Sequence, residues 1–526
     1  MAFIIFLIIT ISVAGITYWL SRKTKSTAEG YFLGGRSLTA GVIAGSLLLT
    51  NLSTEQIVGL NGQAYTEGIL VMCWETLAAI AMVVTALFLL PRYLKGGLTT
   101  IPQFLEVRYD TTTKTIATAL FLSGYAIILL PIVLYSGSLA LITMFEVPEA
   151  FGISHDVALW ICVWTLGIIG SIYAIFGGLK SVAVSDSINA VGLLIGGIMI
   201  PIFGLLYIGD GSIMTGITNL YNNAPEKFDA IGGSDASVPF STIFTGMMLV
   251  QLFYWGTNQA IIQRALAARD LKEGQKGLLL AAFFKILGPL ILVVPGMIAF
   301  YIFKGDLEIP DQAYPKLVKT VLPVGLVGFF AAVLFGAILS SFNSALNSSV
   351  TLFGLDIYKE HFNKEADEST VIKVGKRFGL GLAVFAMIIA PLIAKAPDGL
   401  FGYLQEVNGC YSIPILTIIV VGYLTKYVPA LAAKVAIILG AVLYSISQFG
   451  LKGYFGEDNY PHFLHVMAIL FVMNVIIMLA IGAMKPRKEA FVLPYTEQVD
   501  IEPYKYVRQV GLGIIVVVIL SYVYFS

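Results

Sequence analysis

Long apolar segments alternate with short polar ones along almost the whole chain. An α-helix that crosses the hydrocarbon core of a bilayer needs about 20 apolar residues, and segments of this length recur from one end of the chain to the other. The pattern predicts an all-α membrane protein of about fourteen transmembrane helices. Their expected positions are 2–20, 40–64, 68–91, 115–145, 156–176, 182–208, 239–263, 276–303, 321–356, 376–396, 399–424, 428–449, 461–484 and 507–525.

Two of these apolar segments are interrupted by polar residues near their middle. The run 50–56 (Thr-Asn-Leu-Ser-Thr-Glu-Gln) lies inside segment 40–64, and the polar run 251–259 lies inside segment 239–263. Asn, Gln and Glu side chains are unfavourable in hydrocarbon and persist where they face protein, water or a ligand. Interrupted helices at corresponding positions of two halves point to a binding site near the membrane midplane. We therefore expect two broken helices around a solute and its coupling ion.

The two interruptions also indicate how the chain is divided. Each opens a block of five predicted spans, and because five is odd, the second block starts from the opposite side of the membrane, as an inverted repeat requires. The blocks share no evident sequence identity, so the repeat is inferred from hydropathy alone. The predicted division is a first helix and cytoplasmic loop at 1–39, a first repeat at 40–208, an extracytoplasmic loop at 209–238, a second repeat at 239–424, and three additional helices at 425–526.

Lysine and arginine residues gather in alternate loops. They occupy 22–36, 92–114, 264–276, 359–377 and 485–488, which all lie on one side of a fourteen-span fold. The positive-inside rule places these loops in the cytoplasm and predicts that both termini are extracytoplasmic. The loops of the opposite side carry mainly acidic residues, namely Glu146, Glu149, Asp156, Asp210, Asp229 and Asp235.

The composition agrees with a chain that lies mostly in lipid. Of 526 residues, 57% are hydrophobic and 12% are charged, and the mean hydropathy is +0.86, whereas a soluble domain carries about 25% charged residues. The net charge of zero gives no indication of a nucleic-acid partner.

The three cysteines, Cys73, Cys162 and Cys410, lie in apolar spans without metal or disulfide spacing, so we expect them to be small buried side chains. We expect no cleavable signal peptide, because the basic cluster follows the first apolar run.

Two charged residues are predicted at membrane depth. Glu75 lies early in the third span, and Lys285 lies near the middle of the eighth. They could form a buried pair that locks helices together, or they could face a central cavity, where lysine donates and glutamate accepts hydrogen bonds from a polar solute. The two interpretations are compatible.

The ninth span offers oxygen ligands for a cation. Ala337, Ser340 and Ser341 share one helix face at spacings i, i+3 and i+4. Beside carbonyls freed by a broken helix, such hydroxyls suit a hard cation such as Na⁺; back-bonding to the helix or close helix packing is the alternative. Asp186 lies near the cytoplasmic end of its span and is either part of a second cation site or a solvated terminal acid.

Several short motifs follow one another along the chain. They are YFLGGRSL at 31–38, NLSTEQ at 51–56, TIPQF at 100–104, YWGTNQ at 254–259 with QR at 263–264, LSS at 339–341 with LNS at 346–348, and LQE at 404–406. In this order they resemble the sodium:solute symporter family and, within it, the sodium/glucose cotransporters and uncharacterised bacterial members of that subgroup. The likeness covers essentially the whole chain and implies a LeuT-like core of five-plus-five inverted repeats.

The resemblance implies a role for individual residues. Those matching sugar-hydrogen-bonding positions are Gln56, Glu75, Lys285 and Gln405, with Tyr254 as the stacking aromatic and Asn51 as its partner. The apolar outer gate is matched by Leu60, Trp74 and Phe401. The implied Na⁺ ligands are the carbonyls of Leu49, Leu52 and Ala337 and the hydroxyls of Ser340 and Ser341, while Asp186 matches an acid linked to a second Na⁺ in some members.

Two departures from the family affect the expected solute. Ala78 stands where a sugar-contacting serine is usual, and Gln251 stands where Asn or Thr is usual. Sites built to hydrogen-bond a hydroxyl strongly reject solutes that lack it, so these two changes can alter which sugar binds, and galactose is not assumed.

We expect a Na⁺-coupled importer of a monosaccharide in a bacterial inner membrane, with a uronate, polyol, carboxylate or amino acid as the alternative solute. No metal-ligand cluster, nucleophile motif or phosphate loop suggests an enzyme, and the oligomeric state stays open.

Overall fold

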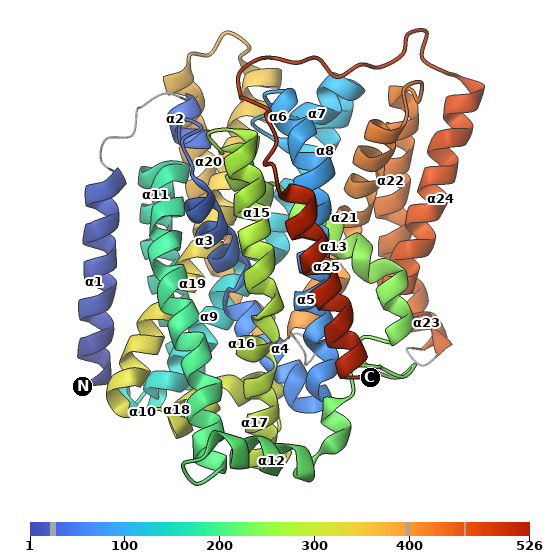
Figure 1. The fold of residues 1–526 in the computed structure, drawn as a ribbon. Helices are drawn as coiled ribbons and strands as arrows, with labels where there is room; N and C mark the ends of the chain where they lie inside the picture. Colours follow the sequence, from blue (N-terminus) through green and yellow to red (C-terminus); the bar gives the residue numbers. More distant parts are fainter. Residues whose placement is uncertain (22–27, 396–399, 457–458) are drawn as a thin grey trace.

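The computed structural model describes residues 1–21, 28–395, 400–456 and 459–526, which form a bundle of helices (Figure 1). The basic residues Arg22, Lys23 and Lys25 of the first predicted loop lie outside the described residues. The first half of the chain holds α1 (Ala2–Ser21), α2 (Ala28–Leu33), α3 (Ala40–Asn51), α4 (Thr54–Glu67), α5 (Cys73–Val84), α6 (Leu90–Lys95), α7 (Ile101–Arg108), α8 (Thr111–Gly124), α9 (Leu130–Phe145), α10 (Val147–Phe151), α11 (His155–Ile208) and α12 (Ile213–Asn223).

The second half is helical as well. It holds α13 (Gly246–Gly256), α14 (Gln259–Leu266), α15 (Leu271–Ile286), α16 (Gly288–Leu292), α17 (Val294–Phe303), α18 (Ala313–Val321), α19 (Val324–Thr351), α20 (Glu368–Ile389), α21 (Leu400–Leu424), α22 (Ala430–Ile446), α23 (Lys452–Phe455), α24 (Phe463–Met484) and α25 (Val507–Tyr524). Short 3₁₀ or π turns continue several of these helices, including η1 (Gly68–Met72), η2 (Thr85–Leu89), η3 (Tyr125–Leu129), η7 (Leu352–Phe362), η8 (Ala390–Lys395) and η9 (Ser447–Leu451).

Fewer helices than predicted are long and apolar enough, taken singly, to cross a membrane. In the described part of the chain there are 10, or 11 if the pair Leu271–Ile286 and Gly288–Phe303, bent by 50°, is one span. The difference has a physical reason. Broken helices have halves shorter than a bilayer, as in Ala40–Asn51, and Thr54–Lys95 forms one apolar stretch although Gly68 interrupts it with a φ of 77°. The count of fourteen therefore stays a prediction.

The long helix α11 contains two predicted spans, 156–176 and 182–208. Gly178, with φ 63° and ψ −179°, separates them. This positive φ suits glycine, and a Cβ there would approach Tyr31 Cδ2 to 3.0 Å. The Tyr31 hydroxyl donates to the carbonyl of Ile175 at 3.0 Å, so the start of motif 31–38 packs directly against this bend.

Both predicted interruptions are breaks in the structure. α3 ends at Asn51, Leu52 and Ser53 leave the helical conformation, and α4 begins at Thr54. α13 ends at Gly256, and α14 begins at Gln259 with Asn258 as its N-cap, whose side chain accepts from the Ala260 amide at 3.0 Å. Each break frees backbone groups at the centre of the bundle.

Polar caps fix where several helices begin at the end of the bundle that is uppermost in Figure 1. Thr100 and Gln103 form a reciprocal capping box at α7. Asp110 caps α8, and Asp270 caps α15, each accepting a backbone N–H at 2.8 Å. Ser, Thr, Asp and Asn are preferred at this position because their oxygens satisfy N–H groups that the helix leaves free.

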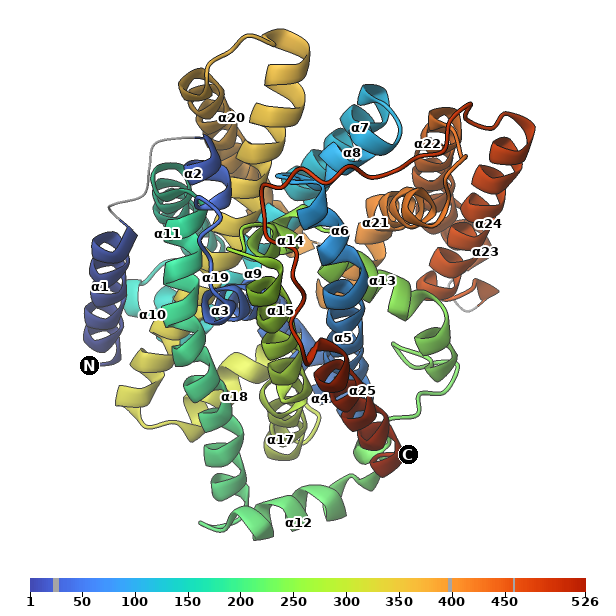
Figure 2. The same cartoon turned by 45° about the horizontal axis from the view of Figure 1, so that its top comes forward.

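The helices that carry the two breaks lie inside the bundle. α1 flanks it on one side, and α22 and α24 flank it on the other (Figures 1 and 2). Both termini lie toward the lower end, whereas segment 485–506 passes over the upper end between α24 and α25. There, the Thr496 amide donates to the Lys95 carbonyl at 3.1 Å, and the Leu271 amide donates to the Asp500 carbonyl at 2.9 Å.

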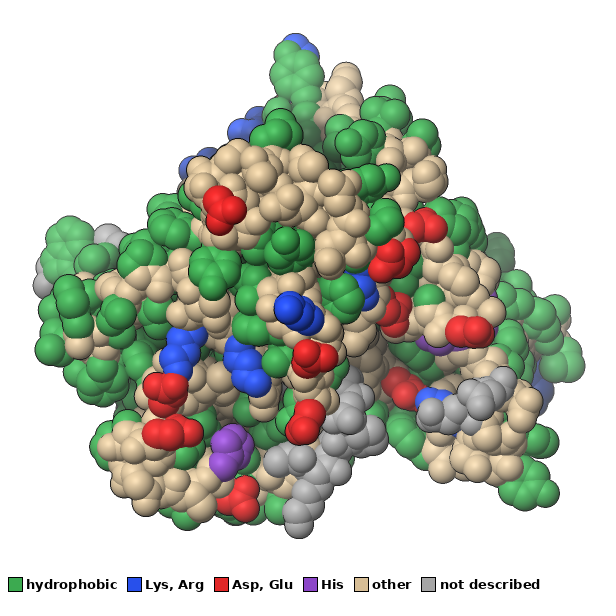
Figure 3. All heavy atoms as spheres, turned by 90° about the horizontal axis from the view of Figure 1, so that it is seen from below, with side chains coloured by type: hydrophobic (Ala, Val, Ile, Leu, Met, Phe, Trp, Pro, Cys, Tyr) green, Lys and Arg blue, Asp and Glu red, His purple; other side chains and the backbone are tan. Residues whose placement is uncertain are grey.

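The two ends differ in charge, although not every basic residue assigned to the upper loops is solvated. Arg108, Lys114 and Arg264 are buried; Arg108 donates to the carbonyls of Gly422, Thr425 and Val428, which satisfies groups left free where α21 ends. Seen from below, the lower face displays acidic side chains, some beside Lys or Arg side chains (Figure 3).

Of the three cysteines, Cys73 is buried as expected, but Cys162 and Cys410 are only half-buried.

Candidate functional site

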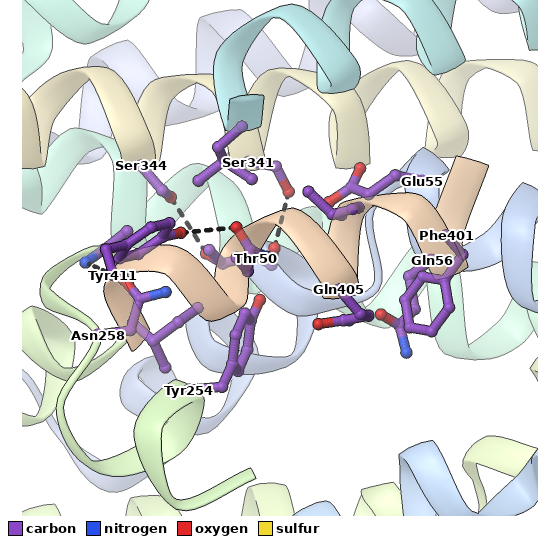
Figure 4. Close-up of a pocket in the computed structure, with 15 residues that line it drawn as sticks. Thr50, Glu55, Gln56, Tyr254, Asn258, Ser341, Ser344, Phe401, Gln405 and Tyr411 are labelled. Atoms are coloured by element: carbon purple, nitrogen blue, oxygen red, sulfur yellow. Dashed lines mark hydrogen bonds between the residues drawn. The ribbon is translucent and has the colours of Figure 1, made fainter. Parts of the chain in front are cut away.

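A cavity lies between the two helix breaks (Figure 4). Its lining comes from the α3–α4 break, the α13–α14 break, α19 and α21, segments far apart in the sequence. The polar and aromatic residues that line it are Thr50, Glu55, Gln56, Tyr254, Asn258, Ser341, Ser344, Phe401, Gln405, Asn408 and Tyr411. Five of the residues predicted for the site are among them: Gln56, Tyr254, Ser341, Phe401 and Gln405.

An adjoining cavity shares part of this lining and contains two predicted gate residues. Trp74 and Phe401 pack edge to face with ring centroids 5.1 Å apart, and the Gln251 amide donates to the Trp74 carbonyl at 2.9 Å. The lining consists of Asn51, Gln56, Trp74, Val250, Gln251, Tyr254, Trp255, Phe401 and Gln405. The third predicted gate residue, Leu60, is fully buried in α4 but lines neither cavity.

Glu75 and Lys285 form an ion pair one layer behind the cavities. Lys285 Nζ lies 2.5 Å from Glu75 Oε2 and also donates to Asn51 Oδ1. The Gln56 amide donates to the other Glu75 oxygen at 2.6 Å. Neither charged residue lines either of these two cavities. The contacts agree with the interpretation of a buried pair, and direct contact of the two residues with a solute stays a prediction. The two charges neutralise each other. The pair is connected to the cavities by its hydrogen bonds to Gln56 and Asn51, which line them.

The surroundings of this pair are closely fitted. Both side chains are at most 1% exposed. A Cβ at Gly288 would lie 2.4 Å from Glu75 Oε2, so glycine is required where α16 begins. The Trp255 ring centroid lies 5.5 Å from Lys285 Nζ, a cation–π contact. Removing one partner from such a buried pair costs about 3–5 kcal/mol, because the other charge is left uncompensated.

A cluster of hydroxyls joins α19 to the end of α3. Ser341 Oγ donates to the Thr50 carbonyl at 2.7 Å, and Thr50 Oγ1 lies 3.2 Å from Ser344 Oγ and 3.4 Å from Ser340 Oγ. Leu49, Leu52 and Ala337, whose carbonyls were predicted ligands, are buried at the same junction. Hydroxyl and carbonyl oxygens form the donor set here, which suits a hard monovalent cation.

Asp186 is not a solvated terminal acid. It is buried in α11, where Ser46 Oγ donates to Asp186 Oδ2 at 2.6 Å and Arg264 Nη2 lies 4.0 Å from the same oxygen. The sequence predicts Arg264 in a cytoplasmic loop, but the residue lies on α14, and its side chain is buried inside the protein. A buried carboxylate requires a compensating charge, and Arg264 supplies it.

Sequence reasoning missed several residues that line the cavity or hold its lining in place. Tyr125, on η3, donates to Asn258 Oδ1 at 2.6 Å and accepts from the Ala260 amide at 3.0 Å, so it holds the second break. Glu55 lines the cavity with its carboxylate bonded to Ser53. A signal was available for Ser344, which lies three and four residues after Ser341 and Ser340, on the same helix face. A signal was also available for Asn408, which lies three residues after Gln405 on the same helix face, whereas Tyr411 had none.

Comparison with known proteins identifies the family. A model of the sodium:solute symporter family matches residues 31–440. The chain belongs to the sodium:solute symporter family. The family resemblance of the sequence motifs is thereby confirmed, and the protein is a multi-pass membrane transporter, not an enzyme. Members of this family are symporters that move a solute together with Na⁺.

Similar proteins within this family are named for different solutes. The chain is 49% identical over 514 residues to the "Uncharacterized symporter YidK" of Escherichia coli (strain K12), covering 98% of this chain and 89% of that protein. It is 34% identical to the sodium/glucose cotransporter of Vibrio parahaemolyticus, covering 82% of each. It is 28% identical to the sodium/myo-inositol cotransporter 2 of Rattus norvegicus, covering 82% of this chain and 67% of that one.

Solved structures show the fold. A substrate-bound, outward-open Na⁺-coupled sialic acid symporter matches with a TM-score of 0.79 at 20% identity, covering 93% of this chain and 98% of that chain. The nucleobase-cation-symport-1 family transporter Mhp1 in a closed conformation matches with a TM-score of 0.55 at 14% identity, covering 86% and 95%. At these identities the likeness concerns architecture, which is that of a LeuT-like transporter.

Proposed function

We propose that the protein uses an inward Na⁺ gradient to take up a neutral monosaccharide across a bacterial inner membrane by alternating access. The observation that carries this proposal is the amide-rich lining between the two helix breaks. Gln56, Gln251 and Gln405 offer amide donors and acceptors there, and Tyr254 offers an aromatic face. Amides pair with hydroxyls in either direction, and an aromatic face suits the apolar side of a sugar ring.

The charge of the site favours a neutral solute. Among the described residues that line the two cavities, none is Lys or Arg. Lys285, the cation just behind them, is already paired with Glu75 and bonded to Asn51. A carboxylate or uronate would therefore find no free cation at this site, and burying an uncompensated anion is strongly unfavourable. These contacts favour a neutral sugar over an acidic solute.

A cyclic polyol is a second candidate. The similar proteins named for their solutes include a glucose cotransporter and myo-inositol cotransporters. Glucose and myo-inositol are both six-membered rings that carry hydroxyls all round, and the same amides and aromatic face serve either one. Asn51, Glu75 and Lys285 then act by holding Gln56 and Tyr254 in place.

The coupling ion is assigned to the junction of α3 and α19. The proposed ligands are the carbonyls of Leu49, Leu52 and Ala337 with the hydroxyls of Ser340 and Ser341. The buried, all-oxygen character of this junction supports the assignment. Leucine and alanine are acceptable there because their ligand atom belongs to the backbone.

The site is too small to hold a hexose in this structure. Each of the two cavities has a volume of about 30 Å³, room for about two water molecules. A hexose therefore requires the surrounding helices to separate, as alternating access demands.

We propose that blocks 40–208 and 239–424 form the two inverted repeats within fourteen spans. Segment 1–39 then precedes the repeats, the loop 209–238 lies between them, and 425–526 follows them.

The orientation proposal makes a prediction. Both termini lie toward the lower end in Figure 1, whereas the described basic loops lie at the other end. The positive-inside rule then places both termini outside the cytoplasm. An alkaline phosphatase fused after Ser526 is expected to be active in the periplasm, whereas the same fusion after Lys488, in the upper segment, should be inactive. The reverse activities would contradict the orientation.

Uptake into proteoliposomes tests the proposed function. Vesicles containing the full chain would receive radiolabelled D-glucose, D-galactose, myo-inositol, glucuronate or proline, with sodium or choline outside. We expect a neutral ring solute to accumulate when the Na⁺ gradient points inward, and not in choline. Accumulation of glucuronate or proline instead would overturn the assignment to a neutral sugar, and equal uptake in choline would overturn Na⁺ coupling.

A further inference from the structure

A third cavity lies at the upper end of the bundle and shares no lining residue with the two cavities at the helix breaks. It is formed by α7, the start of α8 and η7, the segment that continues α19; α7 and α8 are near the top of Figure 1. Its volume is about 450 Å³, within the range of about 300–1,000 Å³ that small-molecule sites occupy. The charged side chains that line it are Glu106, Lys114, Asp356, Lys359, Glu360 and Lys364.

Four of these charges balance one another. Lys114 Nζ lies 2.7 Å from Glu106 Oε2 and 3.0 Å from Glu360 Oε2. Lys364 Nζ lies 3.3 Å from the other Glu360 oxygen. Two lysines therefore compensate two glutamates, and neither glutamate needs a ligand to neutralise it.

Asp356 is the carboxylate that these pairs leave over. It is fully buried, and Thr100 Oγ1 donates to its Oδ2 at 2.8 Å. The Gln103 side chain lies near the same carboxylate, and the charge of Lys114 acts on it, although that ammonium is bonded to the two glutamates. In the described part of the chain, no donor lies within hydrogen-bond distance of Asp356 Oδ1. Buried polar groups ordinarily have a partner, so this oxygen calls for a donor from outside the chain.

Lys359 is the cation that the pairs leave over. It is exposed, lies three residues after Asp356 on η7 and lines the same cavity. Among the described residues it has no ion-pair partner. The cavity thus combines an unpaired carboxylate at a buried position with an unpaired ammonium at an exposed one. A bound metal ion is not favoured, because the described residues include no group of three acidic, histidine or cysteine side chains that could hold one.

We propose that this cavity binds a small zwitterion, with its ammonium group at Asp356 Oδ1 and its oxyanion at Lys359. The two leftover charges differ in sign and in depth, so a ligand that carries both charges satisfies them together, whereas a simple cation or anion satisfies only one. Ethanolamine phosphate has this chemistry, either as the soluble ester or as the headgroup of phosphatidylethanolamine. The site is separate from the helix breaks, so the proposal does not depend on the proposed function.

Calorimetric titration of the full chain in phosphatidylglycerol nanodiscs tests the site. O-phosphoethanolamine should bind saturably, at one molecule per chain. Ethanolamine lacks the oxyanion and glycerol 3-phosphate lacks the ammonium, so each should bind about tenfold or more weakly, the effect of one lost bond to a charged group. No saturable binding of O-phosphoethanolamine, or equally tight binding of glycerol 3-phosphate, overturns the proposal.

Two variants assign the charges. Asp356→Asn should weaken O-phosphoethanolamine binding about tenfold or more, whereas Lys359→Gln should remove only the preference for this ligand over ethanolamine. The matched controls, Glu365→Gln and Lys373→Gln, change exposed residues that do not line the cavity and should leave the affinity unchanged. An Asp356→Asn protein that elutes as a monodisperse species in size-exclusion chromatography and keeps the wild-type affinity overturns the assignment. If this variant does not fold, the wild-type ligand series decides.

Lipid composition separates the two sources of the ligand. If a lipid headgroup occupies the cavity, nanodiscs that contain phosphatidylethanolamine should compete with the soluble ester and weaken its apparent binding. If the soluble ester is the ligand, its affinity should be equal in both kinds of nanodisc. Either result supports the site and identifies its occupant, whereas absence of binding in phosphatidylglycerol nanodiscs contradicts both.

Discussion

Lys285→Ala is expected to abolish solute uptake. The substitution leaves the Glu75 carboxylate buried without its cation and removes the donor that holds Asn51 Oδ1. Breaking a buried pair from one side costs about 3–5 kcal/mol, and the released Glu75 no longer fixes Gln56, its hydrogen-bond partner at the cavity. Uptake of labelled glucose and myo-inositol in proteoliposomes would fall to the level of empty vesicles.

A double variant separates a structural role of this pair from a role in the site. Removing both charges with Glu75→Leu and Lys285→Met leaves no uncompensated charge, so stability should recover to near the wild-type value. Uptake should nevertheless stay absent, because Gln56 and Asn51 lose their partners.

The matched control is Lys272→Ala. Lys272 lies near the start of the same helix, and its Nζ lies 3.5 Å from Glu502 Oε2 at the surface. The Lys272→Ala protein should transport normally. A Lys285→Ala protein with wild-type solute affinity would contradict the site.

Ser341→Ala is expected to weaken Na⁺ activation of uptake by about 10- to 100-fold, the effect of losing one charged-group contact of about 1.5–3 kcal/mol. One hydroxyl is a large part of a proposed five-oxygen site, and a methyl group cannot replace it. The concentration of Na⁺ that gives half-maximal uptake measures the change.

The control for this variant lies on the same helix. Ser349 is equally buried, but its hydroxyl donates only to the Ala345 carbonyl at 2.8 Å, within α19. Ser349→Ala should therefore leave the Na⁺ dependence unchanged. If Ser341→Ala keeps a normal Na⁺ dependence, the ion does not bind at the α3–α19 junction.

The sequence alone predicted the features that arise where a polar residue falls inside a membrane-length apolar segment. Polar runs in apolar segments predicted the breaks around Leu52 and Asn258, because polar side chains are unfavourable on a continuous helix in hydrocarbon. The same reasoning predicted a partner for Lys285, since a charge at this depth must be compensated. These features depend on local composition, which the chain displays directly.

The sequence failed where the outcome depends on tertiary packing. Arg264 follows a span and reads as an ordinary loop residue, yet α14 turns it inward onto Asp186, which is distant in sequence. Tyr125 and Tyr411 carry no signal of their own, because a membrane helix accommodates aromatic residues anywhere along its length. Nothing in the pattern distinguished a side chain that lines the cavity, such as Gln56, from Lys285 one layer behind it.

Calorimetric titration of the purified protein with its preferred solute, in sodium and then in choline buffer, tests Na⁺-coupled symport most directly. Leu52 and Gln56 belong to the same broken helix, so ion binding at the first should order the segment that binds solute at the second. Coupling between two ligands is reciprocal and commonly amounts to about 5- to 150-fold. The account predicts tighter solute binding in sodium by a factor in this range, and an equal tightening of Na⁺ binding by the solute. Equal solute affinity in the two buffers would contradict it.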